Sequence, residues 1–110
     1  MRTIKVFDFY FDDMVEATGY PFERLSSDTK EQVFVYMRFI IWDIMHKAGY
    51  SQSEIARLFN RKPCTVNVGL KRYTNDLMFG NQNLILTKDR FERNLRHILS
   101  KRKTEEVCNQ

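Results

Sequence analysis

The sequence predicts an all-α fold, a compact domain of about five or six helices that contains a helix-turn-helix. Apolar residues recur every three or four positions through most of the 110 residues, as on the buried face of a helix. No two neighbouring segments alternate as paired strands would. Residues 51–76 carry start and turn signals for two helices in succession. We expect one domain over residues 1–103 and a disordered tail at 104–110, where no apolar pattern remains.

The first helix of the predicted helix-turn-helix begins at Ser51. Ser51 and Glu54 have the spacing of a capping box, in which each side chain binds the backbone N–H of the other residue. The inward face that follows is small and apolar: Ile55, Ala56 and Phe59. Asn60 then stands where a turn residue that tolerates left-handed backbone is needed.

The second helix of this pair is predicted to start at about Lys62 and to continue to Leu77. Pro63 suits the first turn of a helix, because its missing N–H would have no intrahelical partner there. The apolar residues of this helix are spaced i, i+4, i+7: Val66, Leu70 and Tyr73. Two short helices, a tight turn and a basic second helix together predict a helix-turn-helix.

The N-terminal half of the sequence predicts a short helix, a single helical turn and then the start of a long helix. A helix is expected at about residues 8–17, and Gly19 is a natural residue to end it. Residues 21–25 are expected to form a single helical turn. Ser26–Thr29 are rich in capping side chains and are expected to start a long helix that runs to about Lys47.

The long helix is apolar on most sides over residues 33–45, which indicates burial at the centre of the domain. The alternative is that this apolar excess forms a face for self-association. After a turn-rich loop at 79–83, Thr87 is expected to cap a last helix. Its predicted inward residues follow helical spacing: Phe91, Leu95, Ile98 and Leu99.

Charge is unevenly distributed along the chain, whose formal net charge is +4. Residues 1–50 hold 6 Lys and Arg against 8 Asp and Glu, whereas residues 51–110 hold 12 against 6. The basic half begins at the predicted helix-turn-helix. This distribution favours a phosphate ligand, because each neutralised phosphate releases counterions. The alternative is a solvated basic surface with no specific ligand.

The residue patterns of common enzyme classes are missing. Only 4 glycines are present, and none has the spacing of a phosphate-binding loop. The adjacent carboxylates of Asp12 and Asp13 would point apart on a helix. Cys64 has no nearby histidine to activate it, and the 2 cysteines and 2 histidines lack zinc-ligand spacing. We therefore expect no enzyme, no catalytic residue, no cofactor, no metal and no small-molecule substrate.

The cellular compartment is predicted from cysteine content and hydropathy. Two cysteines are too few for a disulfide framework. The apolar segment at 33–45 is too short to span a bilayer and is interrupted by Arg38 and Asp43. Residues 1–11 contain Arg2, Lys5 and Asp8 and no small-residue cleavage site, so we expect no signal peptide. We expect a cytoplasmic protein with no membrane partner.

Several segments together resemble the C-terminal, origin-binding domain of the bacterial replication initiator DnaA, a Trp-repressor-like helix-turn-helix domain. The resemblance covers roughly residues 8–100 and rests on five segments that agree in order and spacing: Val15–Ser26, Arg38–Trp42, Ser51–Phe59, Arg61 with Thr65–Val66, and Thr87–Leu99. It implies duplex DNA as the partner, and a role in DNA replication or transcription regulation.

The sequence departs from this family where the family reads DNA. The family signature is Gly-Gly-Arg-Asp-His-Ser/Thr-Thr-Val, whereas this chain has the shorter Asn60–Val66 segment. Lys62 and Pro63 replace the base-reading Asp-His pair, and Cys64 replaces the first hydroxyl residue. The family's basic loop before the long helix is nearly neutral here, at Ser27–Gln32. The origin-box preference of the family is therefore not expected to carry over.

These patterns lead to the hypothesis that the helix at 62–74 enters the major groove of duplex DNA. Six residues are predicted to face bases or the groove: Lys62, Cys64, Thr65, Asn67, Val68 and Lys71. Five are predicted to meet phosphates: Ser51, Arg61, Arg72, Lys30 and Lys47. Asn67 would read adenine, and Val68 would contact a thymine methyl group.

Two other hypotheses remain open at this stage. The first is a protein–protein interaction module that retains the initiator-like fold but has little DNA specificity, and that binds a replication protein or itself. The second is a regulator that binds palindromic half-sites as a dimer.

Overall fold

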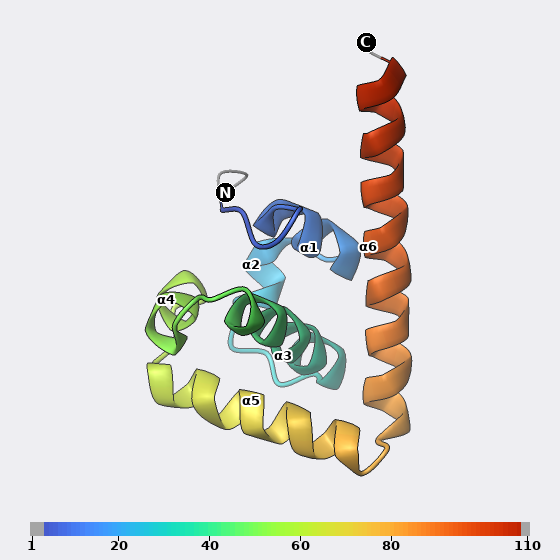
Figure 1. The fold of residues 1–110 in the computed structure, drawn as a ribbon. Coiled ribbons are helices and arrows are strands. Elements are labelled where there is room, and N and C mark those ends of the chain that lie inside the picture. The colour runs from blue at the N-terminus through green and yellow to red at the C-terminus, as the bar shows by residue number, and fades with distance from the viewer. Residues whose placement is uncertain (1–3, 109–110) are drawn as a thin grey trace.

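The computed structural model describes residues 4–108, with side chains described for residues 4–101. Six helices make up this part of the chain: α1 (Phe11–Thr18), α2 (Phe22–Leu25), α3 (Gln32–Lys47), α4 (Gln52–Leu58), α5 (Pro63–Met78) and α6 (Gln82–Cys108) (Figure 1). The described residues form no strand, and their only β-type pairing is an isolated bridge between Lys5 and Tyr10. The predicted all-α fold with about six helices is confirmed.

Helix α3 is the centre of the domain. Nine of its 16 residues are buried, and α2, α4, α5 and α6 all pack against it (Figure 1). Since Phe34, Ile41 and Met45 are each at most 2% exposed, the apolar excess of this helix is used inside the domain. The prediction that residues 33–45 are buried at the centre of the domain is therefore confirmed.

An aromatic cluster joins α1, α2 and α3 to the residue that ends α4. The Phe59 ring lies edge-on to those of Phe11, Phe22 and Trp42, with centroid distances of 6.0, 5.3 and 5.7 Å respectively. Edge-to-face packing is the arrangement that aromatic quadrupoles prefer. The cluster fixes the start of the turn between α4 and α5 against the rest of the core.

The local signals around α4 and α5 form as predicted. The Glu54 N–H donates to Ser51 Oγ at 3.1 Å, and the Ser51 N–H donates to Glu54 Oε1 at 3.0 Å. The hydrogen bonds that Ser51 makes to the Glu54 carboxylate, first that of its backbone N–H and then that of its side chain, lower the pKa of Glu54. Asn60 has left-handed backbone with φ 55°, and Pro63 is the first residue of α5.

The N-terminal signals are confirmed in part. Gly19 ends α1 with φ 81°, and the single turn expected at 21–25 is α2. Helix α1 begins at Phe11 rather than near residue 8, because Val6 to Tyr10 form a tight turn. In this turn the Val6 N–H donates to the Phe9 carbonyl at 2.9 Å, and the Phe11 N–H donates to Ile4 at 2.8 Å.

The predicted start of the long helix is wrong. Helix α3 begins at Gln32 after Glu31, which makes no side-chain cap, whereas capping was expected from Ser26–Thr29. Those residues do not enter a helix because their carbonyls accept hydrogen bonds from Arg38 and Arg61 instead.

The predicted start of the last helix is also wrong. Helix α6 begins at Gln82, since Asn81 Oδ1 accepts the Leu84 N–H at 3.1 Å and so caps the helix. Thr87 lies inside the helix and donates to the Asn83 carbonyl. At the other end α6 is helical to Cys108, although a tail was expected from 104; residues 109–110 lie outside the described part.

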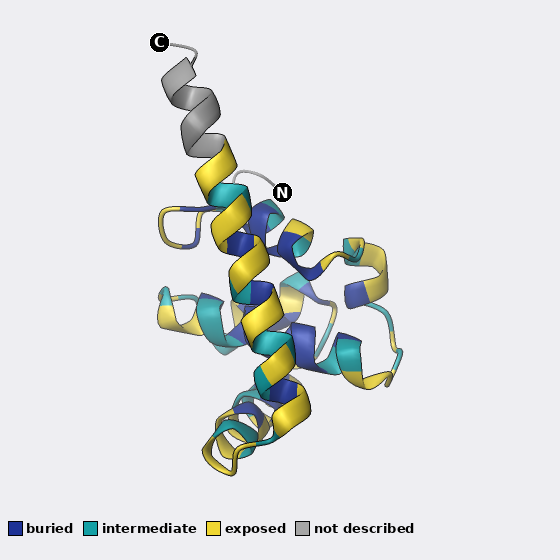
Figure 2. Cartoon of the chain, turned by 90° about the vertical axis from the view of Figure 1, so that its right-hand side faces the viewer, coloured by how far each residue is buried: buried dark blue, intermediate teal, exposed yellow. Residues whose placement is uncertain are grey.

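Helix α6 packs along α1 and α3 and continues past the rest of the domain (Figure 1). Its inward residues Leu84, Phe91 and Leu95 are buried. Exposed residues run along its outer side as far as residue 101 (Figure 2). Helix α6 therefore packs against the domain with one side and exposes its other side to solvent.

The closest approach between helices is at Gly69, where α5 crosses α3. A Cβ atom at this position would lie 2.7 Å from Trp42 Cζ3 and 3.0 Å from Phe39 Cε1. Any larger residue would thus push α5 away from α3 or force the rings to move. The indole Nε1 of Trp42 is buried, and within the described part of the chain it has no hydrogen-bond partner.

We predict that Gly69→Ala destabilises the domain by about 1–3 kcal/mol, the usual cost of overpacking, although alanine favours a helix. In a Trp42→Phe background the same substitution is expected to cost much less, since the ring atom nearest the new methyl group is removed and no hydrogen bond is lost. Urea unfolding of the four proteins in this cycle measures the coupling. An equal cost of Gly69→Ala in both backgrounds would contradict the proposed contact.

Candidate nucleic-acid interface

The turn between α4 and α5 is short and is held by backbone hydrogen bonds. The Arg61 N–H donates to the Ala56 carbonyl at 2.8 Å, and Ala56 is only 1% exposed. Because α4 and α5 are packed together and α5 is held against α3 by Gly69, the orientation of α5 is set from two sides.

Helix α5 buries one side and leaves the other uncovered. Val66, Gly69 and Tyr73 are buried, and burial raises the pKa of the Tyr73 hydroxyl. The opposite side carries an exposed line of residues spaced i, i+4, i+7, i+11: Cys64, Val68, Lys71 and Asn75. We call these four residues the α5 outer line. At 1.5 Å per residue, the line extends over about 17 Å.

The surface around the α5 outer line is basic. Lys62, Lys71 and Arg72 are exposed, and the exposed residues of α5 include no acid. The single acid of this helix is Asp76, which is half-buried and has its Oδ2 4.0 Å from Arg72 Nε. The predominance of cations makes this side of α5 attractive to an anionic ligand.

Most of the predicted groove-facing residues lie together on this surface. Lys62, Cys64, Thr65, Val68 and Lys71 are all exposed, and Val68 retains 62% of its accessible surface. Asn67 differs, because it is half-buried and its Oδ1 accepts a hydrogen bond from Gln52 Nε2 at 3.2 Å. Gln52 of α4 and Asn67 of α5 therefore form one polar unit at the edge of the surface.

Sequence reasoning did not select Asn75, although it continues the α5 outer line by one turn. The helical spacing of positions 64, 68, 71 and 75 is visible in the sequence, but the predicted contact region ended at residue 74. It also did not select Met78 and Phe79, which are 77% and 78% exposed at the end of α5.

The predicted phosphate-binding residues are not brought together. Lys30 precedes α3 and Lys47 ends it, so the two are separated by the helix length of about 24 Å. The Nζ of Lys47 is 3.0 Å from Asp43 Oδ2. Ser51 is exposed, but its side chain is used in the capping box. Arg72 alone flanks the α5 outer line.

Arg61 is turned toward the body of the domain. Its Nη1 donates to the carbonyls of Ser26 and Phe59 at 2.8 and 2.9 Å, and its Nη2 donates to that of Ser27 at 2.6 Å. Three of the five guanidinium N–H groups therefore bind backbone oxygens. This arrangement disfavours the predicted contact with a phosphate and indicates that Arg61 anchors the turn.

Arg38 holds the same segment from the other side. It is 6% exposed, and it donates to the carbonyls of Leu25, Ser27 and Thr29 at 3.0, 3.1 and 2.8 Å. Burial lowers the pKa of Arg38, the neighbouring charge of Arg61 lowers it further, and Asp28 opposes both effects. Both arginines bind the Ser27 carbonyl, so they link α3 to the turn before α5.

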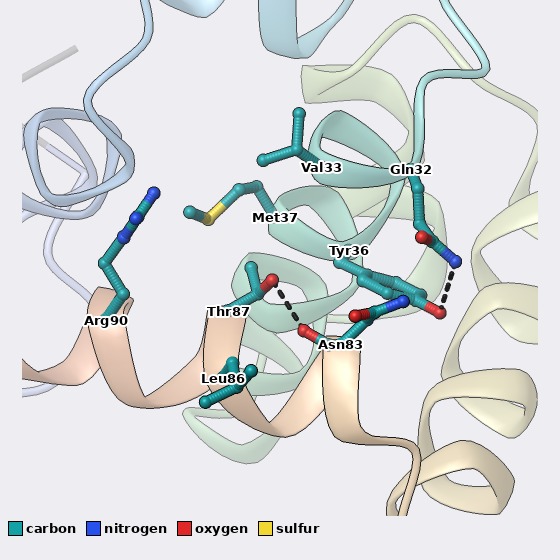
Figure 3. Close-up of a pocket in the computed structure, with 8 residues that line it drawn as sticks. All are labelled: Gln32, Val33, Tyr36, Met37, Asn83, Leu86, Thr87 and Arg90. Carbon is teal, nitrogen blue, oxygen red and sulfur yellow. Dashed lines mark hydrogen bonds between the residues drawn. The ribbon is translucent and has the colours of Figure 1, made fainter.

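A cavity of about 320 Å³ lies between the start of α3 and the start of α6 (Figure 3). The Tyr36 hydroxyl in its wall already has two hydrogen-bond partners. Tyr36 Oη accepts from Gln32 Nε2, also in the wall, at 2.8 Å and from Asn81 Nδ2 at 3.2 Å. Arg90 lies at one end. These lining residues do not include a nucleophile paired with a base.

Among the described residues, no three His, Cys, Asp or Glu side chains are grouped as metal ligands would be. In the same part of the chain, no helix has both the length and the apolar character needed to cross a membrane.

No match is found among protein-family models, curated proteins or solved structures. The resemblance to the initiator domain therefore rests on the residues quoted above. The interface is defined by its own geometry, which is a basic, half-exposed helix supported by α3 and α4.

We predict that Arg61→Lys destabilises the domain by about 1–3 kcal/mol, because one ammonium group cannot reach three carbonyls and charged hydrogen bonds are lost. Thermal unfolding followed by circular dichroism measures this loss. Arg57→Lys is the matched control, since Arg57 is exposed on α4. A residue that served only to bind phosphate would tolerate lysine, and an unchanged Tm for Arg61→Lys would contradict the anchoring role.

Proposed function

We propose that this chain is a small double-stranded DNA-binding protein in which α4 and α5 act as a helix-turn-helix and α5 enters the major groove. The observation that carries this proposal is the side of α5 that is exposed and free of exposed acids, with Lys71 in the α5 outer line and Lys62 and Arg72 beside it. A major groove about 12 Å wide admits one helix. Because α3 and α4 hold the opposite side of α5, the helix is presented as a rigid unit.

The residues of the α5 outer line suit contact with base edges. Val68 is an apolar group that fits the methyl of thymine, and the Asn75 amide has the donor and acceptor needed to read adenine. Asn67 would contribute through its hydrogen bond to Gln52. These contacts would supply sequence preference, whereas the cations would supply affinity.

The cations at the edges of α5 suit the two phosphate backbones. Lys62 lies at the N-terminus of α5 and Arg72 lies near its middle, about 15 Å away along the helix. Lys47 and Lys30, on other elements, would add contacts only if the DNA bends toward them. About three or four phosphate contacts imply a log–log salt slope of roughly −3 to −4.

The biological process follows from the resemblance to the initiator domain. We infer a role in DNA replication or in transcription regulation, with a DNA site different from the origin box because Lys62–Cys64 replace the family's reading residues. We also infer a cytoplasmic location, in keeping with the exposed free thiol of Cys64.

A second candidate function is a protein-interaction module. Met78 and Phe79 at the end of α5 and Leu86 on α6 are each at least 63% exposed, and exposed apolar side chains of this size are typical of protein contacts. A protein that scatters light as a dimer, and loses the dimer on Phe79→Ser without binding duplex DNA, would favour this candidate.

We predict that Lys71→Glu/Arg72→Glu weakens duplex binding by at least about tenfold at roughly 100 mM salt and flattens the salt slope by about 2, since two phosphate or groove contacts are reversed in sign. Fluorescence anisotropy with a duplex selected from random sequences measures both quantities. Circular dichroism checks the fold.

The matched control is Lys5→Glu/Arg57→Glu, which changes net charge equally at exposed positions outside α5. Its affinity is expected to fall by less than about threefold, through long-range attraction alone. Equal losses in the two variants, or no duplex binding by the wild type at this salt concentration, would refute the proposal.

A further inference from the structure

Helix α6 presents a second basic surface, apart from α5. Arg90, Arg93, Arg96 and Lys101 are exposed, and Asp89 is the only acid exposed between residues 88 and 101. Glu92 is half-buried and pairs with Lys88. Within the described part of the chain, none of the four exposed cations lies in an ion pair. We call Arg90, Arg93, Arg96, His97 and Lys101 the α6 stripe.

The α6 stripe is a continuous band on one side of a straight helix. Arg90, Arg93, His97 and Lys101 are spaced by three, four and four residues, so they share one face over about 16 Å. The other side is fixed to the domain, because Phe91 and Leu95 are buried. Beside the band, Asn94 Nδ2 donates to the Ala17 carbonyl at 3.0 Å and ties α6 to the end of α1. Exposed residues recur along the outer side of α6 as far as residue 101 (Figure 2). Arg90 lies at the edge of this side, where it lines the cavity beside α3.

The composition of this band selects the kind of ligand. Every exposed residue between 88 and 101 is polar or charged. A protein interface would need an apolar core with aromatic anchors, and a membrane-surface helix would need an apolar face to insert. Leu86, one turn before Arg90, is 63% exposed, but no exposed apolar residue lies within the row of cations itself. Such a row suits a row of phosphates, for which affinity is mainly electrostatic.

The α6 stripe and the α5 outer line face in different directions. Helix α6 rises steeply from the end of α5, and the domain lies between their inner sides (Figure 1). The α5 outer line points away from α3, whereas Arg93 of the α6 stripe lies on the side of α6 opposite the buried Phe91 and Leu95. A straight duplex in contact with α5 therefore does not pass along the stripe.

From this geometry we infer that the α6 stripe binds the backbone of a second duplex, so that one molecule bridges two segments of DNA. The inference rests on the proposed function for α5, and it adds a second site that reads no bases. The stripe would bind any sequence, since it offers cations and no groove-entering element.

A capture assay tests the bridging. One duplex is fixed to beads, the protein is bound to it at less than one molecule per duplex, and a second, fluorescent duplex is added. The test variant is Arg93→Glu/Arg96→Glu/Lys101→Glu. The matched control is Lys5→Glu/Arg24→Glu/Arg57→Glu, which has the same change in charge at other exposed positions.

The wild type is expected to capture the second duplex, and the control is expected to do so within about threefold. The α6 variant is expected to capture at least about tenfold less, because three of its phosphate contacts are reversed. Its affinity for a single duplex is expected to stay close to that of the control. Capture that persists in the α6 variant, as from a dimer that uses two copies of α5, would overturn the inference.

The assay separates this inference from the proposed function. If the wild type binds one duplex through Lys71 and Arg72 but captures no second duplex, only the bridging fails. If Lys71→Glu/Arg72→Glu binds normally while the α6 variant does not bind, the proposed function of α5 fails as well. Capture of single-stranded RNA or of anionic vesicles in place of the duplex would overturn the choice of DNA.

Discussion

The contact between Gly69 and Trp42 is the constraint on which the arrangement of α5 depends. Without a side chain at position 69, α5 approaches the indole ring of the central helix closely enough that a methyl group would collide with it. This approach decides which side of α5 is buried. The side left open is the one that carries Cys64, Val68, Lys71 and Asn75. A packing requirement inside the domain thus determines the surface that is available for a ligand.

A second constraint comes from two arginines whose guanidinium groups form hydrogen bonds inside the protein. Arg38 and Arg61 both bind backbone carbonyls in the segment before α3. Burial lowers the pKa of Arg38, and the neighbouring positive charge of Arg61 lowers it further. The carbonyl dipoles and Asp28 offset this repulsion. The hydrogen bonds of the two arginines tie the turn that precedes α5 to the core, so the orientation of α5 is fixed before any ligand binds.

Features that depend on a few adjacent residues were predictable from the sequence. The Ser51–Glu54 capping box, the left-handed Asn60 and Pro63 at the start of α5 are all local. The start of α6 was missed because Asn81 and Thr87 are both plausible caps, and only tertiary packing selects between them. Arg61 was assigned to a phosphate for a related reason. Its carbonyl partners at Ser26 and Ser27 lie 35 and 34 residues away in the chain, so no local pattern indicates them.

The central claim is that the exposed side of α5 meets DNA, and an NMR titration tests it most directly. A short duplex selected by the protein is added to the ¹⁵N-labelled chain, and amide chemical shifts are followed. The account predicts that the largest changes occur along α5, at Cys64, Val68, Lys71 and Asn75, while the buried positions Val66 and Tyr73 change little. Changes confined to other elements, with the α5 amides unmoved at saturation, would contradict it.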